Sequence, residues 1–304
     1  MPLFRFRFDA MASPNELQVW HDDPARAREL ADTAIGDVRR IEAKYSRYRD
    51  DSVTTRINRA AGGQPVAIDA ETFALLGYAD QCHHLSAGRF DITSGVLRRA
   101  WDFRRSPPRL PDAAEIAAAS ALIDWPAVEW DRHGVRLPRR GMEIDFGGIG
   151  KEYAADRMAT ICGDAGAPHA LANLGGDVRA AGPQRDGSPW RVGISHPRKD
   201  DAVLATVELA GGAVATSGDY ERFFDISGRR YCHIIDAKSG WPVAWWQSVS
   251  VVAPLCVVAG TCATIAMLLE ADAESFLARE GLVYLAVDHA GALRGPAVVA
   301  PPQQ

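Results

Sequence analysis

The residues of this sequence best suited to chemistry lie in Asp145-Phe-Gly-Gly-Ile-Gly-Lys151, which brings a carboxylate, three glycines and a lysine together. We expect a strand to end at Asp145 and a helix to begin near Lys151. Glycines let a backbone approach a ligand closely, and a helix N-terminus suits a phosphate. A tight strand-to-helix turn explains the same pattern without a ligand. The segment is neither a Walker loop, because Glu152 follows the lysine, nor a GxGxxG motif in a βαβ unit.

Three other stretches combine polar residues with glycine. Asn173-Leu-Gly-Gly-Asp177 has a second glycine pair, which a bulged strand also explains. His233-Ile-Ile-Asp236 follows Ala215-Thr-Ser-Gly-Asp-Tyr220 after one hairpin. His233 could serve as a general base or phosphate contact, or it could be a strand histidine with a local hydrogen bond. Ser86-Ala-Gly-Arg-Phe-Asp91 could contribute to a site, or it could be a capping turn after a helix.

Composition excludes several classes of protein. The 304 residues carry a formal charge of −5 and show no basic stripe with interleaved aromatics, so we expect no nucleic-acid partner. No apolar run reaches about 18 residues, so we expect no membrane span. The five cysteines include no CxxC pair, and we interpret Cys162, Cys256 and Cys262 as core residues. As written, the chain is expected in the cytoplasm, or in the periplasm if a leader has been removed.

The elements that must position these residues do not alternate as in a βαβ fold. We expect a strand pair at 4–10 and 16–20, and helices at 24–45, 70–86, 151–162, 255–270 and 272–280. A hairpin is expected over 127–145, strands over 169–252 with hairpin turns at Gly211-Gly212 and Ser227-Gly228, and a last strand at 282–287. Asp112 and Glu115 look like a capping pair, and the Pro/Gln tail is expected to fray. This order predicts an α+β fold of mixed or antiparallel strands with flanking helices, in a single domain over 1–304.

Taken together and in order, these motifs resemble the FAD:protein FMN transferase family, also called the ApbE family. The resemblance begins near Ala10-Met-Ala-Ser13 and includes Tyr45-Ser-Arg-Tyr48, Phe90-Asp-Ile-Thr93 and the segment 143–156. It continues through 173–177, 189–191, 215–220 and 233–236, and ends at Ser248-Val-Ser-Val-Val-Ala-Pro254. It implies a two-lobed, T-fold-like domain that binds FAD between its lobes. It also implies transfer of the FMN half to a threonine hydroxyl of a target protein, with release of AMP and the help of Mg²⁺.

The resemblance also implies roles for individual residues. Flavin-contacting positions match Met11, Tyr48, Arg89, Phe90, Asp91, Asp145, Lys151 and Ile235. The wall of the FAD cleft matches Ser217, Gly218, Asp219 and Tyr220. By analogy, Lys151 would reach the pyrophosphate and His233 would take the proton from the incoming threonine. Thr264 and the carbonyl of Gly148 match metal ligands.

One position departs from the family pattern. Gly260 stands where the family usually has the aspartate that binds the metal, and Ala263 stands at a second position that is sometimes acidic. Mg²⁺ prefers hard oxygen ligands that include one or two carboxylates. Gly260 therefore indicates either a damaged metal site or a closely packed helix.

The resemblance and this departure from it leave three possible functions. The chain could be an active FMN transferase, a protein that binds FAD without transferring FMN, or a hydrolase that splits FAD into FMN and AMP. The motifs other than the metal position favour the first.

Overall fold

The computed structural model describes residues 1–296, and its main element is an eight-stranded antiparallel sheet. The strands run in the order β1-β2-β6-β7-β10-β13-β14-β15. Their bounds are β1 Leu3–Ala10, β2 Ser13–Trp20, β6 Ala170–Leu174, β7 Asp177–Ala180, β10 Gly212–Gly218, β13 Trp246–Ala253, β14 Val283–Asp288 and β15 Leu293–Arg294. The sheet therefore joins strands from both ends of the described chain.

Three smaller sheets and the helices complete the fold. The small sheets are β3 (Val66–Ala67), β5 (Gly134–Arg136) and β4 (Glu129–Trp130); β8 (Trp190–Ser195) and β9 (Val203–Leu209); and β11 (Phe223–Ile226) and β12 (Arg229–Cys232). The α-helices are α1 Pro24–Tyr45, α2 Val53–Arg59, α3 Ala70–Leu85, α4 Ala113–Ser120, α5 Gly150–Asp164, α6 Cys256–Leu269 and α7 Ala273–Arg279. Three 3₁₀ segments cover Ile92–Arg99, Trp125–Ala127 and Glu270–Asp272.

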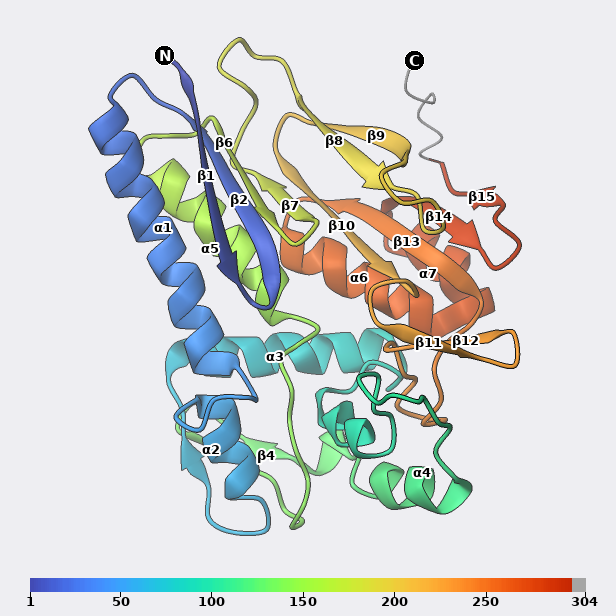
Figure 1. The fold of residues 1–304 in the computed structure, drawn as a ribbon. Coiled ribbons are helices and arrows are strands. Elements are labelled where there is room, and N and C mark those ends of the chain that lie inside the picture. Colours follow the sequence, from blue (N-terminus) through green and yellow to red (C-terminus); the bar gives the residue numbers. More distant parts are fainter. Residues whose placement is uncertain (297–304) are drawn as a thin grey trace.

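The main sheet lies between a helical layer and a hairpin. Helices α1, α5 and α6 lie side by side against one face, with α5 between the other two (Figure 1). The β8–β9 hairpin packs on the opposite face through a second hydrophobic cluster. Helices α2, α3 and α4 lie below the sheet, with α3 crossing beneath α1 and α5 (Figure 1). This arrangement places the start of α5 at the boundary between the two parts.

Alternation along the strands explains why both faces of the sheet are covered. On β10, Ala213 and Ala215 join the core under the helices, whereas Val214 joins the cluster under β8–β9. Strand β14 repeats the pattern, because Tyr284 and Ala286 face the helices and Leu285 faces the hairpin. Successive side chains of a strand point to opposite faces, so each strand supplies both cores.

Most of the predicted elements are confirmed. The strand pair matches β1 and β2, the helices match α1, α3, α5, α6 and α7, and the last strand matches β14. The Asp112–Glu115 pair forms a capping box at the start of α4. Cys162, Cys256 and Cys262 are buried in the core, as predicted. The Pro/Gln tail lies outside the described residues.

Four details differ from the sequence-based expectation. The strand predicted to end at Asp145 is absent, because the segment after β5 is extended but pairs with no strand. The Gly175-Gly176 pair forms the hairpin turn between β6 and β7 rather than a bulge. Gly211-Gly212 connects β9 to β10, which lie in different sheets and form no hairpin. Helix α2 and the 3₁₀ helix Ile92–Arg99 were not predicted, because both are too short to show a period.

One helical stretch of residues 1–296 has the length and apolarity of a membrane span. It runs from Cys256 to Arg279, and its most apolar 18-residue window has a mean hydropathy of 1.5 and is 61% buried in the protein. Helix α6 packs on β10 and β13, and core helices of globular proteins share this composition.

Candidate functional site

Three turns meet where the first residues of α5 face the sheet. Met11 and Ala12 form the β1–β2 turn with positive φ values of 53° and 59°. A Cβ at Gly175, in the β6–β7 turn, would lie 2.7 Å from Oγ of Ser13. Nζ of Lys151, on α5, donates to the carbonyl of Gly175 at 3.4 Å. The structure thus brings Met11 and Lys151 to one place, although 140 residues separate them in the sequence.

Lys151 is held by a buried carboxylate. Its Nζ lies 2.8 Å from Oδ2 of Asp177, and the Asp177 side chain is buried. Burial lowers the pKa of Lys151, but the carboxylates of Asp177 and Glu152 more than offset it, so the net shift of this pKa is upward. The ammonium therefore stays charged at neutral pH. About a third of the Lys151 side chain remains exposed (32%), which leaves the charge available to an anion.

Helix α5 begins without a side-chain cap. Ile149, at the N-cap position, makes no side-chain hydrogen bond to the helix. A Cβ at Gly148, just before the helix, would lie 3.3 Å from the ring of Phe90. Gly148 thus lets the backbone and the aromatic ring approach closely. Uncapped N–H groups and the positive end of the helix dipole favour an anion at this position.

Asp145 is fixed by an arginine that sequence analysis did not single out. Arg47 forms an ion pair with Asp145 and donates from Nη2 to the hydroxyl of Tyr48 at 2.9 Å. Asp145 also accepts from the N–H of Gly147 at 2.9 Å. Arg47 lies within Tyr45-Ser-Arg-Tyr48, so its place beside Tyr48 was the only signal in the sequence.

Tyr48 offers an exposed aromatic face beside this ion pair. The residue is 67% exposed. The guanidinium groups of Arg47 and Arg104 lie 5.0 and 5.8 Å from the centre of its ring. This combination of an open ring and two cations suits a planar, anionic ligand.

The segment 89–91 is held mainly by internal contacts. Nη1 of Arg89 lies 2.6 Å from Oδ2 of Asp236, which links this segment to His233-Ile-Ile-Asp236. Asp91 caps the 3₁₀ helix through the N–H and hydroxyl of Thr93, at 2.7 and 2.6 Å. Its other oxygen accepts from the N–H of Trp125 at 3.3 Å. Oδ2 accepts only one of these bonds, so the Asp91 carboxylate can accept one more from a ligand.

The wall segment 217–220 follows the end of β10. Oγ of Ser217 lies 2.7 Å from Oγ1 of Thr264 on α6. Asp219 is buried in a paired interaction with Arg198, at 2.7 and 2.6 Å. The ring of Tyr220 lies over Gly218, where a Cβ would be 2.3 Å from Cε1 of the ring. Asp219 thus stabilises the wall, whereas Ser217 connects it to α6.

His233 lies next to this wall with its imidazole uncharged. Its backbone N–H donates to the carbonyl of Arg222 at 2.9 Å, but its buried Nδ1 has no hydrogen-bond partner among the described residues. Burial, together with the positive charges of Arg222 and Lys151, lowers the pKa of His233 to about 4. Ile235, two residues later, pairs with Pro242 in an isolated bridge. An uncharged imidazole has one nitrogen that can accept a proton, and the lowered pKa makes His233 a weaker base than a free histidine.

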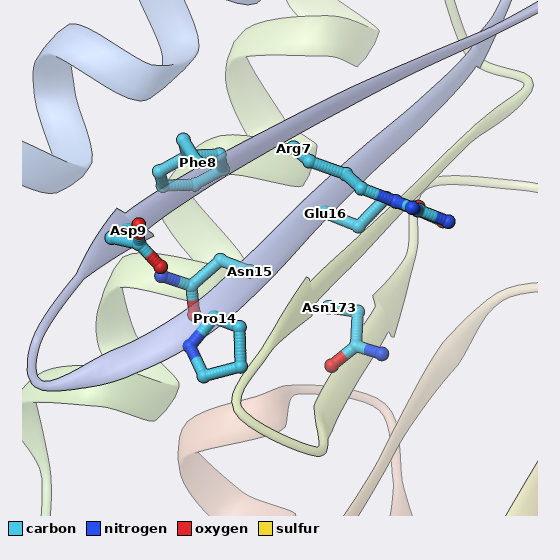
Figure 2. A pocket seen from close by; sticks show the side chains of 7 residues that line it. All are labelled: Arg7, Phe8, Asp9, Pro14, Asn15, Glu16 and Asn173. Atoms are coloured by element: carbon cyan, nitrogen blue, oxygen red, sulfur yellow. The ribbon is translucent and has the colours of Figure 1, made fainter.

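Two hollows flank the β1–β2 turn. The first, of about 380 Å³, is lined by Arg7, Phe8, Asp9, Pro14, Asn15, Glu16 and Asn173 (Figure 2). Arg7 and Glu16 pair there at 2.9 Å, so its main charges neutralise each other. The second, of about 390 Å³, is lined by Asp9, Ala10, Ala12, Ser13, Pro14 and Glu42. The second hollow borders Met11, whose N–H donates to Glu42 at 2.6 Å.

The expected metal position contains a carboxylate from another helix. Residues 1–296 contain no group of three or more His, Cys, Asp or Glu side chains arranged to hold a metal ion. Glu152 of α5, however, packs against Gly260 of α6: a Cβ at Gly260 would lie 2.5 Å from Cγ and 2.8 Å from Oε1 of Glu152. Oε2 of Glu152 is buried without a hydrogen-bond partner. Burial and the charge of Asp177 raise the pKa of Glu152 to about 7. This unpartnered oxygen is a hard donor of the kind that divalent cations prefer, as are the Thr264 hydroxyl and the Gly148 carbonyl that the family resemblance implies as ligands.

Comparisons with known proteins show which family the chain is similar to. Residues 11–285 match the profile of a family described as the ApbE family. The chain is 34% identical over 236 residues to a Klebsiella pneumoniae protein named FAD:protein FMN transferase, covering 77% of this chain and 72% of the relative. A Treponema pallidum protein of the same name is 33% identical over 258 residues, covering 79% of this chain and 71% of the relative.

Solved structures share the fold over nearly the whole length. The ApbE protein of Thermotoga maritima has a TM-score of 0.89 at 32% identity and 97% coverage of each chain. The apo form of the flavinyl transferase ApbE of Pseudomonas stutzeri has a TM-score of 0.83 at 28% identity, covering 97% of this chain and 95% of its own. The predicted α+β class and the resemblance seen in the sequence are both confirmed. This protein therefore belongs to the ApbE family.

Proposed function

We propose that this protein is an FAD:protein FMN transferase, which moves FMN from FAD to a threonine hydroxyl of a target protein and releases AMP. The observation that carries the proposal is a charged Lys151 at the uncapped start of α5, close enough to His233 for its charge to lower the pKa of that imidazole. Curated relatives that are 33–34% identical to the chain bear this name. Lys151 would hold a pyrophosphate, and His233 would accept a proton.

The pyrophosphate of FAD is best accommodated at the start of α5. Lys151 would supply a fixed positive charge, and the uncapped N–H groups of the helix would donate to phosphate oxygens. Phosphoryl transfer depends mainly on positioning and charge neutralisation. A rigid lysine held by Asp177 meets both requirements, because its position is set before the substrate binds.

The flavin ring is best accommodated beside Tyr48. Its exposed ring and the neighbouring Arg47 would contact a planar isoalloxazine by stacking and through charge. Asp145, held by Arg47, would accept a hydrogen bond from the adenine or ribose side of FAD. Met11 and Phe90 would provide apolar contacts at either side of the α5 start.

His233 would act on the incoming hydroxyl. The threonine oxygen would attack the phosphorus of the FMN half, and the bond from that phosphorus to the oxygen of AMP would break. A ring nitrogen of His233 would take the proton of the hydroxyl, which its neutral state permits. Ser217 and Tyr220 would shape the wall past which the target peptide reaches this histidine.

A divalent cation, when bound, would neutralise charge on the phosphate oxygens and on the departing AMP. The residues that could hold it are Thr264, through its hydroxyl, and Gly148, through its carbonyl. Ser217, which shares a hydrogen bond with Thr264, would orient that hydroxyl.

The test is incubation of the full chain with FAD, Mg²⁺ and an acceptor protein carrying the threonine, followed by in-gel flavin fluorescence. We expect a fluorescent acceptor band that is absent without the enzyme and absent when the acceptor threonine is replaced by alanine. If the acceptor band shows no flavin fluorescence although the chain binds FAD, the function would be flavin binding alone. Free FMN without a labelled acceptor would make the protein an FAD hydrolase.

A further inference from the structure

We propose that Glu152 is the carboxylate ligand of the divalent cation in this protein, in the place that an aspartate at position 260 would fill. The inference rests on the proposed function, because it concerns the cation that assists the same reaction. It assigns the ligand to α5 rather than to α6.

The first observation is that Glu152 occupies the space of the missing side chain. Gly260 lies within α6, and an added Cβ there would come within 2.5 Å of Cγ and 3.0 Å of Cδ of Glu152. Real Cβ atoms essentially never come as close as 2.5 Å to another heavy atom, so the glutamate fills the volume into which a residue at 260 would project. Gly260 is thus required by its neighbour, rather than being a simple loss.

The second observation is the unpartnered oxygen. Glu152 is 8% exposed, and its Oε2 has no hydrogen-bond partner among the described residues. Buried carboxylate oxygens are almost always hydrogen-bonded or bound to a metal. A closely packed helix explains why residue 260 is small, but it does not explain a carboxylate with a free oxygen at this place.

The third observation is the position of two other oxygen donors, Thr264 and Gly148, in the elements around Glu152. Thr264 follows Gly260 by one turn of α6, so the two positions lie on the same face of the helix. Gly148 lies two residues before the start of α5 and four residues before Glu152. Glu152 and Thr264 therefore lie on α5 and α6, which pack against each other, and the carbonyl of Gly148 lies just before α5. Mg²⁺ commonly uses one or two carboxylates and keeps several waters.

Direct cation binding tests the assignment without relying on transfer. Mn²⁺ would be titrated into the full chain saturated with FAD, and free Mn²⁺ would be followed by electron paramagnetic resonance. We expect one site in the wild type and at least a tenfold loss of affinity in Glu152→Gln, which keeps the shape but removes the charge. Glu221→Gln is the matched control: its carboxylate also acts on Lys151 and Asp177 but is exposed, and it should change the affinity less than threefold.

The double variant Glu152→Gly with Gly260→Asp returns the carboxylate to α6. We expect it to bind Mn²⁺ within a few-fold of the wild type, and FAD fluorescence quenching would confirm that each variant is folded. Equal Mn²⁺ affinity in the wild type and Glu152→Gln would overturn the assignment, as would a wild type that binds FAD but no Mn²⁺. Failure of the proposed function gives a different result, namely absent FMN transfer with unchanged Mn²⁺ and FAD binding.

Discussion

Glu152 of α5 lies in the space that a side chain at Gly260 of α6 would occupy, with its Cγ 2.5 Å from the position of a Cβ at residue 260. This contact connects α5 and α6 at the proposed cation site. It also makes the two positions interdependent, because a side chain at residue 260 would force the Glu152 side chain to move.

Gly260→Ala should destabilise the protein by about 1–2 kcal/mol. Overpacking a core typically costs about 1–3 kcal/mol, and the helix preference for alanine over glycine returns up to about 1 kcal/mol. Urea unfolding measures the difference. Gly36→Ala on α1 is the matched control, because nothing lies within 4 Å of its Cβ, and it should stabilise by about 0.5–1 kcal/mol. Equal effects of the two substitutions would show that Glu152 does not crowd position 260.

His233→Gln should lower the rate of FMN transfer by about 10²–10⁴-fold, the usual range for a general base. FAD affinity should change less than about threefold, because His233 is proposed to act on the threonine. Single-turnover transfer and fluorescence quenching measure the two quantities. The control is His169→Gln, since the ring of His169 bonds only to the carbonyl of Pro183. A parallel loss of FAD affinity in His233→Gln would assign this histidine to flavin binding instead.

Asp156→Asn should destabilise the protein by about 2–4 kcal/mol. The buried carboxylate accepts from the N–H groups of Cys256 and Val257, at 2.8 and 2.9 Å, and pairs with Arg179 at 3.1 Å. An amide can accept fewer of these bonds and leaves Arg179 without its countercharge. Thermal unfolding checks the effect, with the exposed Asp164→Asn at the end of α5 as the control. A shift equal to that of Asp164→Asn would show that Asp156 does not anchor α6.

Glu71 should make stability depend on pH in the acid range. Hydrogen bonds from Arg40, and then from Lys44 and Tyr153, hold the pKa of Glu71 well below its ordinary value of about 4.5. A lowered folded-state pKa gives stability that is present above about pH 4.5 and is lost as the pH falls below it. Glu71 is partly exposed, so we expect Glu71→Gln to cost only about 1–2 kcal/mol at pH 7.

Unfolding of wild type and of Glu71→Gln at several pH values tests this contribution of the Glu71 carboxylate to stability. The difference in unfolding free energy between wild type and Glu71→Gln should shrink between pH 4.5 and pH 2.5. Glu29→Gln, whose carboxylate is exposed beside Arg26, should show almost no difference at either pH. A gap between wild type and Glu71→Gln that does not narrow would contradict the lowered pKa.

The sequence predicted the elements whose signals are local. The alternation in β1 and β2, the apolar stripe of α1 and the capping box of Asp112 and Glu115 each depend on near neighbours. Arg47 was missed because its partner Asp145 lies 98 residues away. Sequence spacing alone does not indicate that Arg47 and Asp145 are in contact, because they meet only in the folded chain.

The expected cation site at Glu152 and Gly260 could be predicted only in part, because its residues are also far apart in the sequence. Gly260 was recognised as unusual from its position, but Glu152 was noted only as a mismatch to a phosphate-binding loop. That the two residues share one volume follows from the packing of α5 against α6. Such packing depends on the whole sheet and is not encoded in either segment alone.

The central claim is FMN transfer, and the measurement that tests it most directly is the product balance of one reaction. The chain would be incubated with FAD, Mg²⁺ and an acceptor protein, with flavin-labelled acceptor counted by intact-protein mass spectrometry and AMP and free FMN counted by chromatography. We predict one AMP for each FMN bound to an acceptor threonine, little free FMN, and loss of both products in His233→Gln. AMP matched by free FMN, or no products from a chain that binds FAD, would contradict the account.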